Sequence, residues 1–372
     1  MVRCVKFPIF GCFGHIESQT DHHSILSFVR RSGVVPVRRG LIILPQEERN
    51  MKRLTLVLVA LAAIVAIATP AMAEYSLYGS VRVKTFYVDN DKNAVDKQTF
   101  TLELQPNTRF GAKVKADNLG GHIEFGLKAE TSGVYTRLAY GTLKTDSGRL
   151  LVGQAYSPYF SNASQVYGDD SSFAGFGNLW DKRNPQIRFD LTSGLYVVAT
   201  KVVSQGNAIV ETIMPKMTVG FKSKADNLTY NVGAVYQTFD TTGEVEVTSY
   251  MGYADLALKL DQVALRTKLH YGQNLSDLGM FSRNSTYNTT TDKDTSSYGG
   301  WVQAGVGMAT VGLGYVAEDI DGAAEVDTQM ALFANYKIKL AKGMTITPEV
   351  LYKDFMDSST GADQGDELAI GA

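Results

Sequence analysis

The chain has 372 residues, of which 44% are hydrophobic and 20% charged, and its formal net charge is −2. This ordinary composition excludes neither a soluble globular protein nor a membrane barrel. Glycine, tyrosine and phenylalanine are frequent and proline is scarce, a balance that suits long strands joined by tight turns. Both cysteines, Cys4 and Cys12, precede Met51, so disulfides and cysteine-metal sites are excluded from the rest of the chain.

An export signal is predicted from residue 51 onward. Residues 51–53 read Met-Lys-Arg, residues 54–68 are apolar except for one threonine, and Ala71 and Ala73 flank Met72. A charged start, a short apolar run and an A-x-A site are the three parts of a secretory signal peptide. Cleavage is therefore expected between Ala73 and Glu74, the alternative being an ordinary buried helix.

The segment before this signal is expected to be no part of the working protein. An export signal is read at the start of a chain, so Met51 is the expected start of translation. Residues 46–48 (Gln-Glu-Glu) can be encoded by a ribosome-binding sequence shortly before the Met51 codon. Residues 1–50 would then be leader DNA read as protein, the alternative being a genuine extension.

The charge balance changes when residues 1–73 are set aside. That segment holds 9 of the 36 basic and 4 of the 38 acidic residues, which leaves 27 against 34 and a net charge of −7. A nucleic-acid partner is not expected for a domain with that balance.

Apolar and polar residues alternate along residues 74–372. In 109–116, Phe110 and Val114 fall on one face while Arg109 and Lys113 fall on the other. Period two is the pattern of a β-strand, and it recurs in 122–128, 186–191 and 216–224. No segment after residue 73 has 18 consecutive apolar residues, so helical membrane spans are excluded there.

The lengths of the predicted strands and connections favour a membrane barrel. Strands in a β-sandwich have about 5–6 residues, whereas membrane strands need roughly 9–11, and 75–88, 228–238 and 326–340 fit the longer class. Seven short turns are expected at 117–121, 145–148, 192–194, 225–227, 260–262, 309–311 and 341–343. Eight longer links are expected near 89–97, 129–134, 156–184, 204–215, 239–247, 272–297, 318–325 and 357–364.

Fifteen such connections join sixteen strands. Short periplasmic turns on one rim and long extracellular loops on the other are typical of outer-membrane barrels. The sequence therefore predicts an all-β fold, a transmembrane antiparallel β-barrel of about 16 strands, over residues 74–372. Tyrosines that could form interfacial girdles, or simply favour strands, are Tyr75, Tyr78, Tyr140, Tyr236, Tyr315, Tyr336 and Tyr352.

The charged strand faces are expected to point into a wet lumen. A lysine or arginine at mid-membrane on the lipid face costs roughly 2–4 kcal/mol, and a barrel of sixteen strands leaves an aqueous channel. The expected lumen-facing residues are Arg82, Arg109, Lys113, Arg137 and Arg188. For each arginine, a structural ion pair with a neighbouring strand is the alternative.

The third long link, 156–184, is aromatic and acidic. Exposed aromatic surface is unfavourable, so we expect this loop to fold into the barrel and narrow it, the alternative being a loop packed on a neighbouring subunit. Asp169 and Asp170 would then face the basic wall. Opposed charges across a constriction orient dipolar solutes and set ion preference.

Four short motifs resemble a known family. The segments Tyr75–Arg82 (YSLYGSVR), 109–111 (RFG) and 149–154 (RLLVGQ) resemble trimeric Gram-negative porins, and 153–157 (GQAYS) is similar to their dicarboxylate-channel-like branch. The resemblance implies a homotrimer in outer-membrane lipid, a third-loop constriction, and diffusion of ions and small hydrophilic solutes. Such barrels end in an aromatic residue, whereas this sequence ends at Ala372, so its last strand is expected to be cut short.

Two other functions are weighed against a channel. Enzymatic activity is not expected, because His122 and His270 are the only histidines after residue 73 and lie near opposite rims without a nucleophile motif. No catalytic residue, cofactor or metal-ligand cluster is predicted. A structural or adhesive barrel with a plugged lumen is the alternative function.

Overall fold

The structure is a computed structural model that describes residues 73–372, apart from 93–96, 129–132, 169, 171–172 and 281–284. The chain divides into two units, Met1–Ile67 and Ala68–Ala372, and the fold below belongs to the second. Residues 1–72, which include the expected leader, the signal segment and Ala71, lie outside the described residues. Ala73 is described, and the first strand begins at Glu74.

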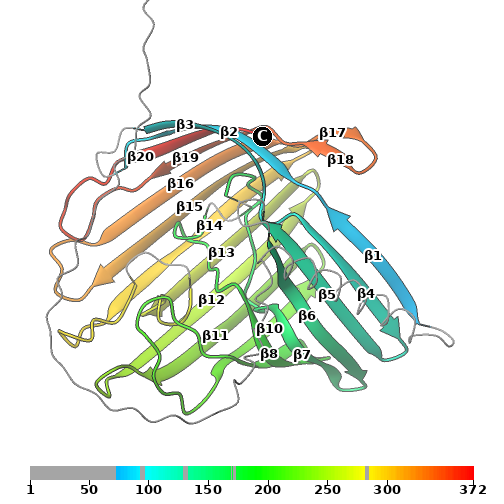
Figure 1. Cartoon of the computed structure of the whole chain (residues 1–372), viewed down its shortest axis with the longest axis horizontal. Helices are drawn as coiled ribbons and strands as arrows, with labels where there is room; N and C mark the ends of the chain where they lie inside the picture. The colour runs from blue at the N-terminus through cyan, green and yellow to red at the C-terminus, as the bar shows by residue number, and fades with distance from the viewer. Residues whose placement is uncertain (1–72, 93–96, 129–132, 169, 171–172, 281–284) are drawn as a thin grey trace, which may run out of the picture. The chain divides into compact units, whose positions relative to one another are not determined.

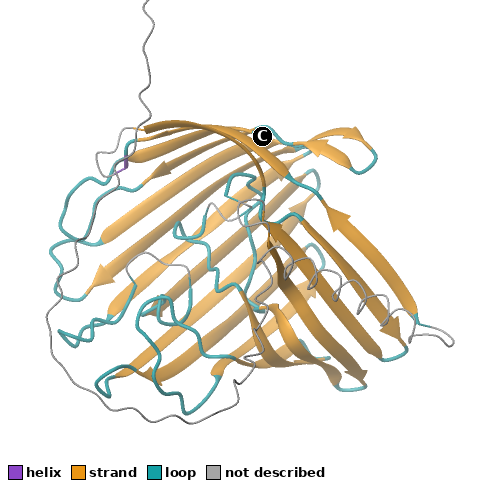
Figure 2. Ribbon diagram, in the orientation of Figure 1, coloured by secondary structure: helices purple, strands orange, loops and turns teal. Residues whose placement is uncertain are grey.

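The described part is built from twenty β-strands joined by turns and loops (Figure 2). They are β1 (Glu74–Ser80), β2 (Val83–Asn90), β3 (Lys97–Leu104), β4 (Arg109–Ala116), β5 (Leu119–Lys128), β6 (Gly133–Thr145), β7 (Gly148–Tyr156), β8 (Arg183–Leu191), β9 (Leu195–Thr200), β10 (Lys216–Ala225), β11 (Leu228–Asp240), β12 (Glu246–Leu260), β13 (Val263–Gln273), β14 (Thr295–Val306), β15 (Ala309–Ile320), β16 (Asp327–Tyr336), β17 (Ile338–Ala341), β18 (Met344–Ile346), β19 (Glu349–Asp354) and β20 (Asp366–Gly371). Among these residues, no helix has the length and hydrophobicity needed to cross a membrane.

Eighteen of the described strands pair with antiparallel neighbours in one curved sheet (Figure 1), and β17 and β18 pair with each other in a separate two-stranded sheet. The order runs from β3 through β2, β20, β19 and β16, and then in reverse chain order from β15 to β4 and finally β1. β1 and β3 stand at the two ends of this order, so the hydrogen bonds of the described strands do not close the sheet into a complete cylinder. The fold is the predicted all-β barrel type.

Twenty segments make sixteen long strands because four of the long strands are interrupted. β1 continues into β2, β3 into β4, β16 into β17, and β18 into β19. Pro106 lies in the break between β3 and β4, and Pro348 lies in the break between β18 and β19. Since proline has no backbone N–H to donate to a ladder, the pairing is interrupted on both strands at these points. The predicted strands 75–88 and 326–340 are therefore each broken once.

Six of the seven predicted tight turns lie between neighbouring strands, and the eight longer links join strands at the opposite ends. The seventh, predicted at 309–311, is displaced: the turn lies at 307–308, because β15 already begins at Ala309. Three of the tight turns contain an aspartate in the left-handed region: Asp117 (φ 49°), Asp226 (φ 46°) and Asp261 (φ 46°). Aspartate tolerates this conformation better than most residues with a side chain. The repeated Asp-Asn pair at 117–118 and 226–227 is therefore a turn signal.

The two faces of the sheet differ in burial as the alternation predicts. In β16, Gln329 and Ala331 are fully buried, whereas Leu332 between Ala331 and the buried Phe333 is 41% exposed. Apolar residues exposed on the outer face fit a lipid solvent, because lipid tails are as apolar as leucine. The buried polar face lines the lumen.

A row of tyrosines crosses the outer face from β11 to β15. Tyr236 is opposite Tyr250, and Tyr271 is opposite Tyr298 in the register of the strands. These four side chains and Tyr315 are 37–56% exposed. A row of exposed tyrosines near one rim is the aromatic girdle of a membrane barrel.

Replacing Val302 on the outer face of β14 with lysine tests which face meets lipid. Val302 is 43% exposed, and we expect Val302→Lys to lower the free energy of unfolding by roughly 2–4 kcal/mol, because a lysine would sit in hydrocarbon. The measurement is urea unfolding of protein refolded into lipid vesicles, with Val302→Leu as the matched control. Equal stability of the two variants would place this face in water.

Candidate functional site

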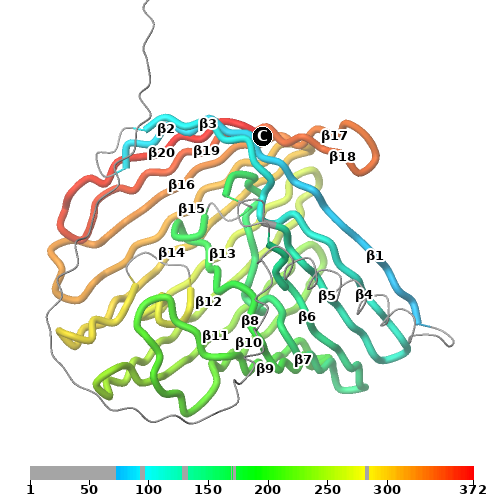
Figure 3. Tube along the Cα trace, in the orientation of Figure 1, coloured from blue at the N-terminus to red at the C-terminus, as the bar shows by residue number. Residues whose placement is uncertain are grey.

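The chain between β7 and β8, residues 157–182, crosses the lumen (Figure 3). The backbone N–H of Ser164 donates to Gln303 Oε1 at 2.7 Å, and that of Val166 donates to Glu349 Oε2 at 2.7 Å. Asn335 Nδ2 donates to the carbonyl oxygen of Ser164 at 2.6 Å. Gln303, Asn335 and Glu349 lie on the lumen faces of β14, β16 and β19, so the loop is bound along the opposite wall from its origin.

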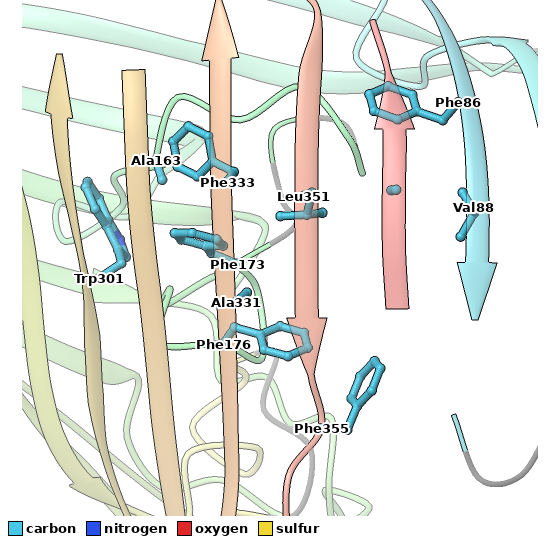
Figure 4. Packing of buried hydrophobic residues seen from close by; sticks show 11 residues of the cluster. Phe86, Val88, Ala163, Phe173, Phe176, Trp301, Ala331, Phe333, Leu351 and Phe355 are labelled. Atoms are coloured by element: carbon cyan, nitrogen blue, oxygen red, sulfur yellow. The ribbon is translucent and has the colours of Figure 1, made fainter. Parts of the chain in front are cut away.

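Aromatic side chains fasten the middle of this loop to the wall (Figure 4). Phe173 packs on Phe333 with ring centroids 5.4 Å apart, and Phe176 packs on Phe355 at 5.4 Å. Phe173 is fully buried. The aromatic residues Phe173 and Phe176, part of the pattern that predicts an inward-folded loop, are thus buried inside the barrel.

A buried ion pair holds the end of the loop. Lys216 Nζ at the start of β10 lies 3.0 Å from Asp181 Oδ2, and both side chains are 0% exposed. Asp181 also accepts hydrogen bonds from Ser157 Oγ, at 2.7 Å, and from the hydroxyl of Tyr159, at 2.5 Å. Burial and the neighbouring carboxylate raise the pKa of Tyr159 well above its ordinary value, so its hydroxyl stays protonated and donates.

A second buried lysine binds the loop from β13. Lys268 Nζ donates to the carbonyl oxygen of Tyr159, and Asn231 Nδ2 donates to that of Pro158 at 3.0 Å. An uncompensated buried charge is very costly, so these contacts fix both side chains and the loop together.

The tip of the loop meets the part of the wall where Pro106 interrupts the strand between β3 and β4. Arg82 Nη1 lies 2.5 Å from Asp170 Oδ2, and Asn107 Nδ2 donates to the same oxygen at 3.1 Å. Gln105 Nε2 donates to the carbonyl oxygen of Val166 at 2.9 Å. The interruption of the ladder by Pro106 therefore frees residues on both sides of it to bind the loop.

Glu124 on β5 is the centre of a polar network on this wall. Arg137 Nε lies 2.6 Å from Glu124 Oε1, and Arg109 Nε lies 3.5 Å from Glu124 Oε2. The hydroxyl of Tyr78 donates to Glu124 Oε2 at 2.7 Å and contacts His122 Nε2 at 2.6 Å. Glu124 is only 4% exposed, so its charge is compensated almost entirely by protein groups.

Arg137 reaches this network through a β-bulge. The register of β5 with β6 jumps from Glu124↔Leu138 to Phe125↔Thr136, so Arg137 has no partner of its own. A bulge places one extra residue on a strand and re-aims its side chain. Here it directs Arg137 onto Glu124 and onto the hydroxyl of Tyr156, which accepts from Nη2 at 3.0 Å.

Further arginines line β7 and β8. Arg149 Nη2 lies 2.7 Å from Asp190 Oδ2, and Arg188 Nε lies 2.6 Å from Asp190 Oδ1. The ammonium group of Lys113 lies 5.4 Å from the centre of the Tyr78 ring.

The positive charges on this wall outnumber the carboxylates paired with them. The wall comprises Arg82, Arg109, Arg137, Arg149, Arg183 and Arg188, paired in part with Asp170, Glu124 and Asp190. Six guanidinium groups face three carboxylates, which leaves an excess of three positive charges among the described residues. We call these six arginines the arginine wall.

The structure brings the expected site residues together only in part. Arg82 meets Asp170 across the lumen, whereas Arg109, Arg137 and Arg188 are paired with carboxylates on strands, the alternative left open for each arginine. Asp169 lies outside the described residues. Tyr78 and Tyr140 both contact His122 inside the lumen, so the girdle position suggested for them is wrong.

Sequence reasoning missed the residues that bind the loop. These are Asp181, Lys216, Lys268, Gln303, Asn335 and Glu349. The strand period places Lys216 on a polar face, but nothing in the pattern distinguishes a buried lysine from one in open water. The proline at 106 is the one local signal for a break in the wall.

A family model described as Gram-negative porin matches residues 60–364. No curated protein matches the chain.

Solved structures share the fold. The outer membrane channel DcaP of Acinetobacter baumannii is similar with a TM-score of 0.66 and 20% identity, over 82% of this chain and 97% of that one. An anion-selective porin from Comamonas acidovorans has a TM-score of 0.55 and 15% identity, over 81% and 98%. OmpT of Vibrio cholerae in its trimer form has 0.52 and 15%, over 81% and 98%. Because the family model covers most of the sequence, the chain belongs to the Gram-negative porins, channels of the bacterial outer membrane through which small hydrophilic solutes diffuse passively.

Proposed function

We propose that this porin is a homotrimer in outer-membrane lipid whose lumen, narrowed by residues 157–182, passes small hydrophilic anions in preference to cations. The excess of positive charge on the arginine wall is the observation that carries the proposal. The expected lining residues Arg82, Arg109, Lys113, Arg137, Asp170 and Arg188 belong to this constriction.

The arginine wall acts although the chain as a whole is acidic. Residues 74–372 carry a net charge of −7, but an ion in a narrow passage responds to the charges nearest to it. Unit charges separated by about 6 Å of water interact by about 0.7 kcal/mol before screening, and salt reduces interactions beyond about 8–10 Å. Three excess charges at the constriction therefore outweigh acidic loops farther away.

Exposed apolar surface supports the trimer. Tyr75, Leu77 and Val81 are 71%, 72% and 80% exposed, and Phe100 and Leu102 on β3 are 70% and 69% exposed. Tyr75 and Leu77 lie on β1, Val81 directly follows it, and β1 and β3 stand at the ends of the sheet order. Large exposed apolar patches mark interaction sites. OmpT, which has the same fold, has a trimer form, and we assign this surface to contacts between subunits.

The contacts of the two histidines, His122 and His270, favour a channel over an enzyme. His122 contacts the hydroxyl groups of Tyr78 and Tyr140 at 2.6 and 3.0 Å, and His270 is buried. Catalysis by a serine or threonine nucleophile needs a general base within hydrogen-bond reach, and the contacts of His122 are phenols.

Removing two arginines while keeping every carboxylate paired tests the ion preference. In Arg109→Gln with Arg188→Gln, Glu124 keeps Arg137 and Asp190 keeps Arg149. We expect the anion-over-cation permeability ratio to fall roughly threefold. The variant removes the attraction of two positive charges for the passing anion, and salt weakens that attraction. The measurement is the reversal potential across a planar bilayer in a salt gradient.

The matched control carries the same charge change away from the constriction. Lys339 and Lys342 are exposed at the β17–β18 hairpin, and Lys339→Gln with Lys342→Gln is expected to keep the wild-type reversal potential. A double-arginine variant with the wild-type potential would contradict the assignment of anion preference to the arginine wall.

Breaking the buried ion pair tests the role of the loop. We expect Lys216→Met to lower the free energy of unfolding by about 3–5 kcal/mol, because it leaves the Asp181 carboxylate buried and unpaired. Conductance of single channels is expected to rise as the loop end is released. Urea unfolding and planar-bilayer recording measure the two effects.

A double variant separates charge from packing. Asp181→Asn retains an oxygen that accepts from Ser157 and Tyr159, so Lys216→Met with Asp181→Asn is expected to be more stable than Lys216→Met alone. If Lys216→Met matched the wild type in both stability and conductance, the ion pair would have no part in holding the loop.

A further inference from the structure

An aromatic stack stands where the loop leaves β7 and returns to β8. The rings of Tyr156 and Phe160 are 4.5 Å apart and nearly parallel, with an angle of 9° between them. Trp180 tilts against Phe160 with centroids 4.8 Å apart. All three rings are partly exposed, unlike Phe173 and Phe176 farther along the loop, which are buried.

The guanidinium group of Arg183, which has no carboxylate partner among the described residues, lies against this aromatic stack. Arg183 Cζ is 5.3 Å from the centre of the Tyr156 ring and 5.2 Å from that of Trp180. Within the described ranges, no carboxylate lies at ion-pair distance from Arg183, whereas each of the other five arginines of the wall has one. Its positive charge therefore lies against the faces of these two rings rather than against a carboxylate.

A second guanidinium converges on the same point. Arg137 Nη2 donates to the hydroxyl of Tyr156 at 3.0 Å, and Arg183 Nη1 approaches the same oxygen at 3.5 Å. Glu124 is shared between Arg137 and Arg109, so one carboxylate serves a region that holds three guanidinium groups. Two like charges beside one phenol oxygen repel each other, and an anion bound next to Arg183 would reduce that repulsion.

From these contacts we infer that Tyr156, Phe160, Trp180 and Arg183 form a binding subsite for aromatic carboxylates that pass through the channel. The inference rests on the anion-passing channel proposed above and names a solute class for it. The planar fork of arginine matches a carboxylate, and partly exposed rings offer a face on which another ring can stack. Neither feature alone selects an aromatic anion, but their juxtaposition does.

Three probes of similar size separate ring stacking from charge. Benzoate has both a planar ring and a carboxylate, cyclohexanecarboxylate has the carboxylate without the aromatic face, and benzylamine at neutral pH has the ring with the opposite charge. Each is added to wild-type channels carrying a chloride current across a planar bilayer. We expect benzoate to reduce the current at roughly three- to tenfold lower concentration than cyclohexanecarboxylate, the range that an aromatic pair contributes. Benzylamine is expected to reduce it least.

A variant then locates the effect. Trp180→Leu is expected to remove most of the difference between benzoate and cyclohexanecarboxylate. Tyr287→Leu is the matched control, because Tyr287 is an aromatic residue on the loop between β13 and β14, and it is expected to keep that difference.

Two results would contradict the aromatic subsite, and both can be distinguished from a result that contradicts the proposed anion preference. Equal reduction by benzoate and cyclohexanecarboxylate in the wild type contradicts an aromatic subsite, even where the reversal potential shows anion preference. A benzoate effect that survives Trp180→Leu contradicts its location. The absence of anion preference in the reversal potential contradicts the proposed function itself.

Discussion

The buried pair of Asp181 and Lys216 is the contact on which the arrangement of the lumen depends. Moving two charges out of water costs several kcal/mol for each ion, and only good geometry with further hydrogen bonds repays that cost. Ser157 and Tyr159 supply such bonds to Asp181. Any displacement of the loop that separates the pair would leave a buried carboxylate unpaired, so the loop has one favourable position.

That position divides the lumen into two unlike halves. On one side, the loop covers β14, β16 and β19 with hydrogen bonds and packed aromatic rings, and little of that wall meets water. On the other side lies the arginine wall, in which the side chains of Arg82, Arg109 and Arg149 are 33%, 29% and 45% exposed. In the proposed function, a solute therefore passes beside the arginine wall, because the loop occupies the other half of the lumen.

The sequence predicts the fold better than it predicts the site. Strand period, turn residues and loop lengths are local properties, so sixteen strands with tight turns on one rim follow from them. Pairing across the lumen is not local: Lys216 and Asp181 are 35 residues apart, and Ser164 and Gln303 are 139 apart. Strand parity tells which face a side chain takes, but it does not tell which of those side chains the loop will cover.

Irregularities in the strand pairing explain why some lumen residues have contacts that the sequence pattern does not predict. Parity alone gives Arg137 the environment of any other lumen residue, but the bulge beside Glu124 turns it into the bridge between Glu124 and Tyr156. Pro106 opens the wall where Gln105 and Asn107 bind the loop tip. A regular ladder uses its backbone donors and acceptors in neighbouring strands, so the wall binds the loop through side chains: those of Gln303, Asn335 and Glu349 on regular strands, and those of Gln105 and Asn107 beside the proline break. The constriction therefore depends on both kinds of strand: regular strands supply the side chains that bind the middle and the end of the loop, and the proline break supplies those that bind its tip.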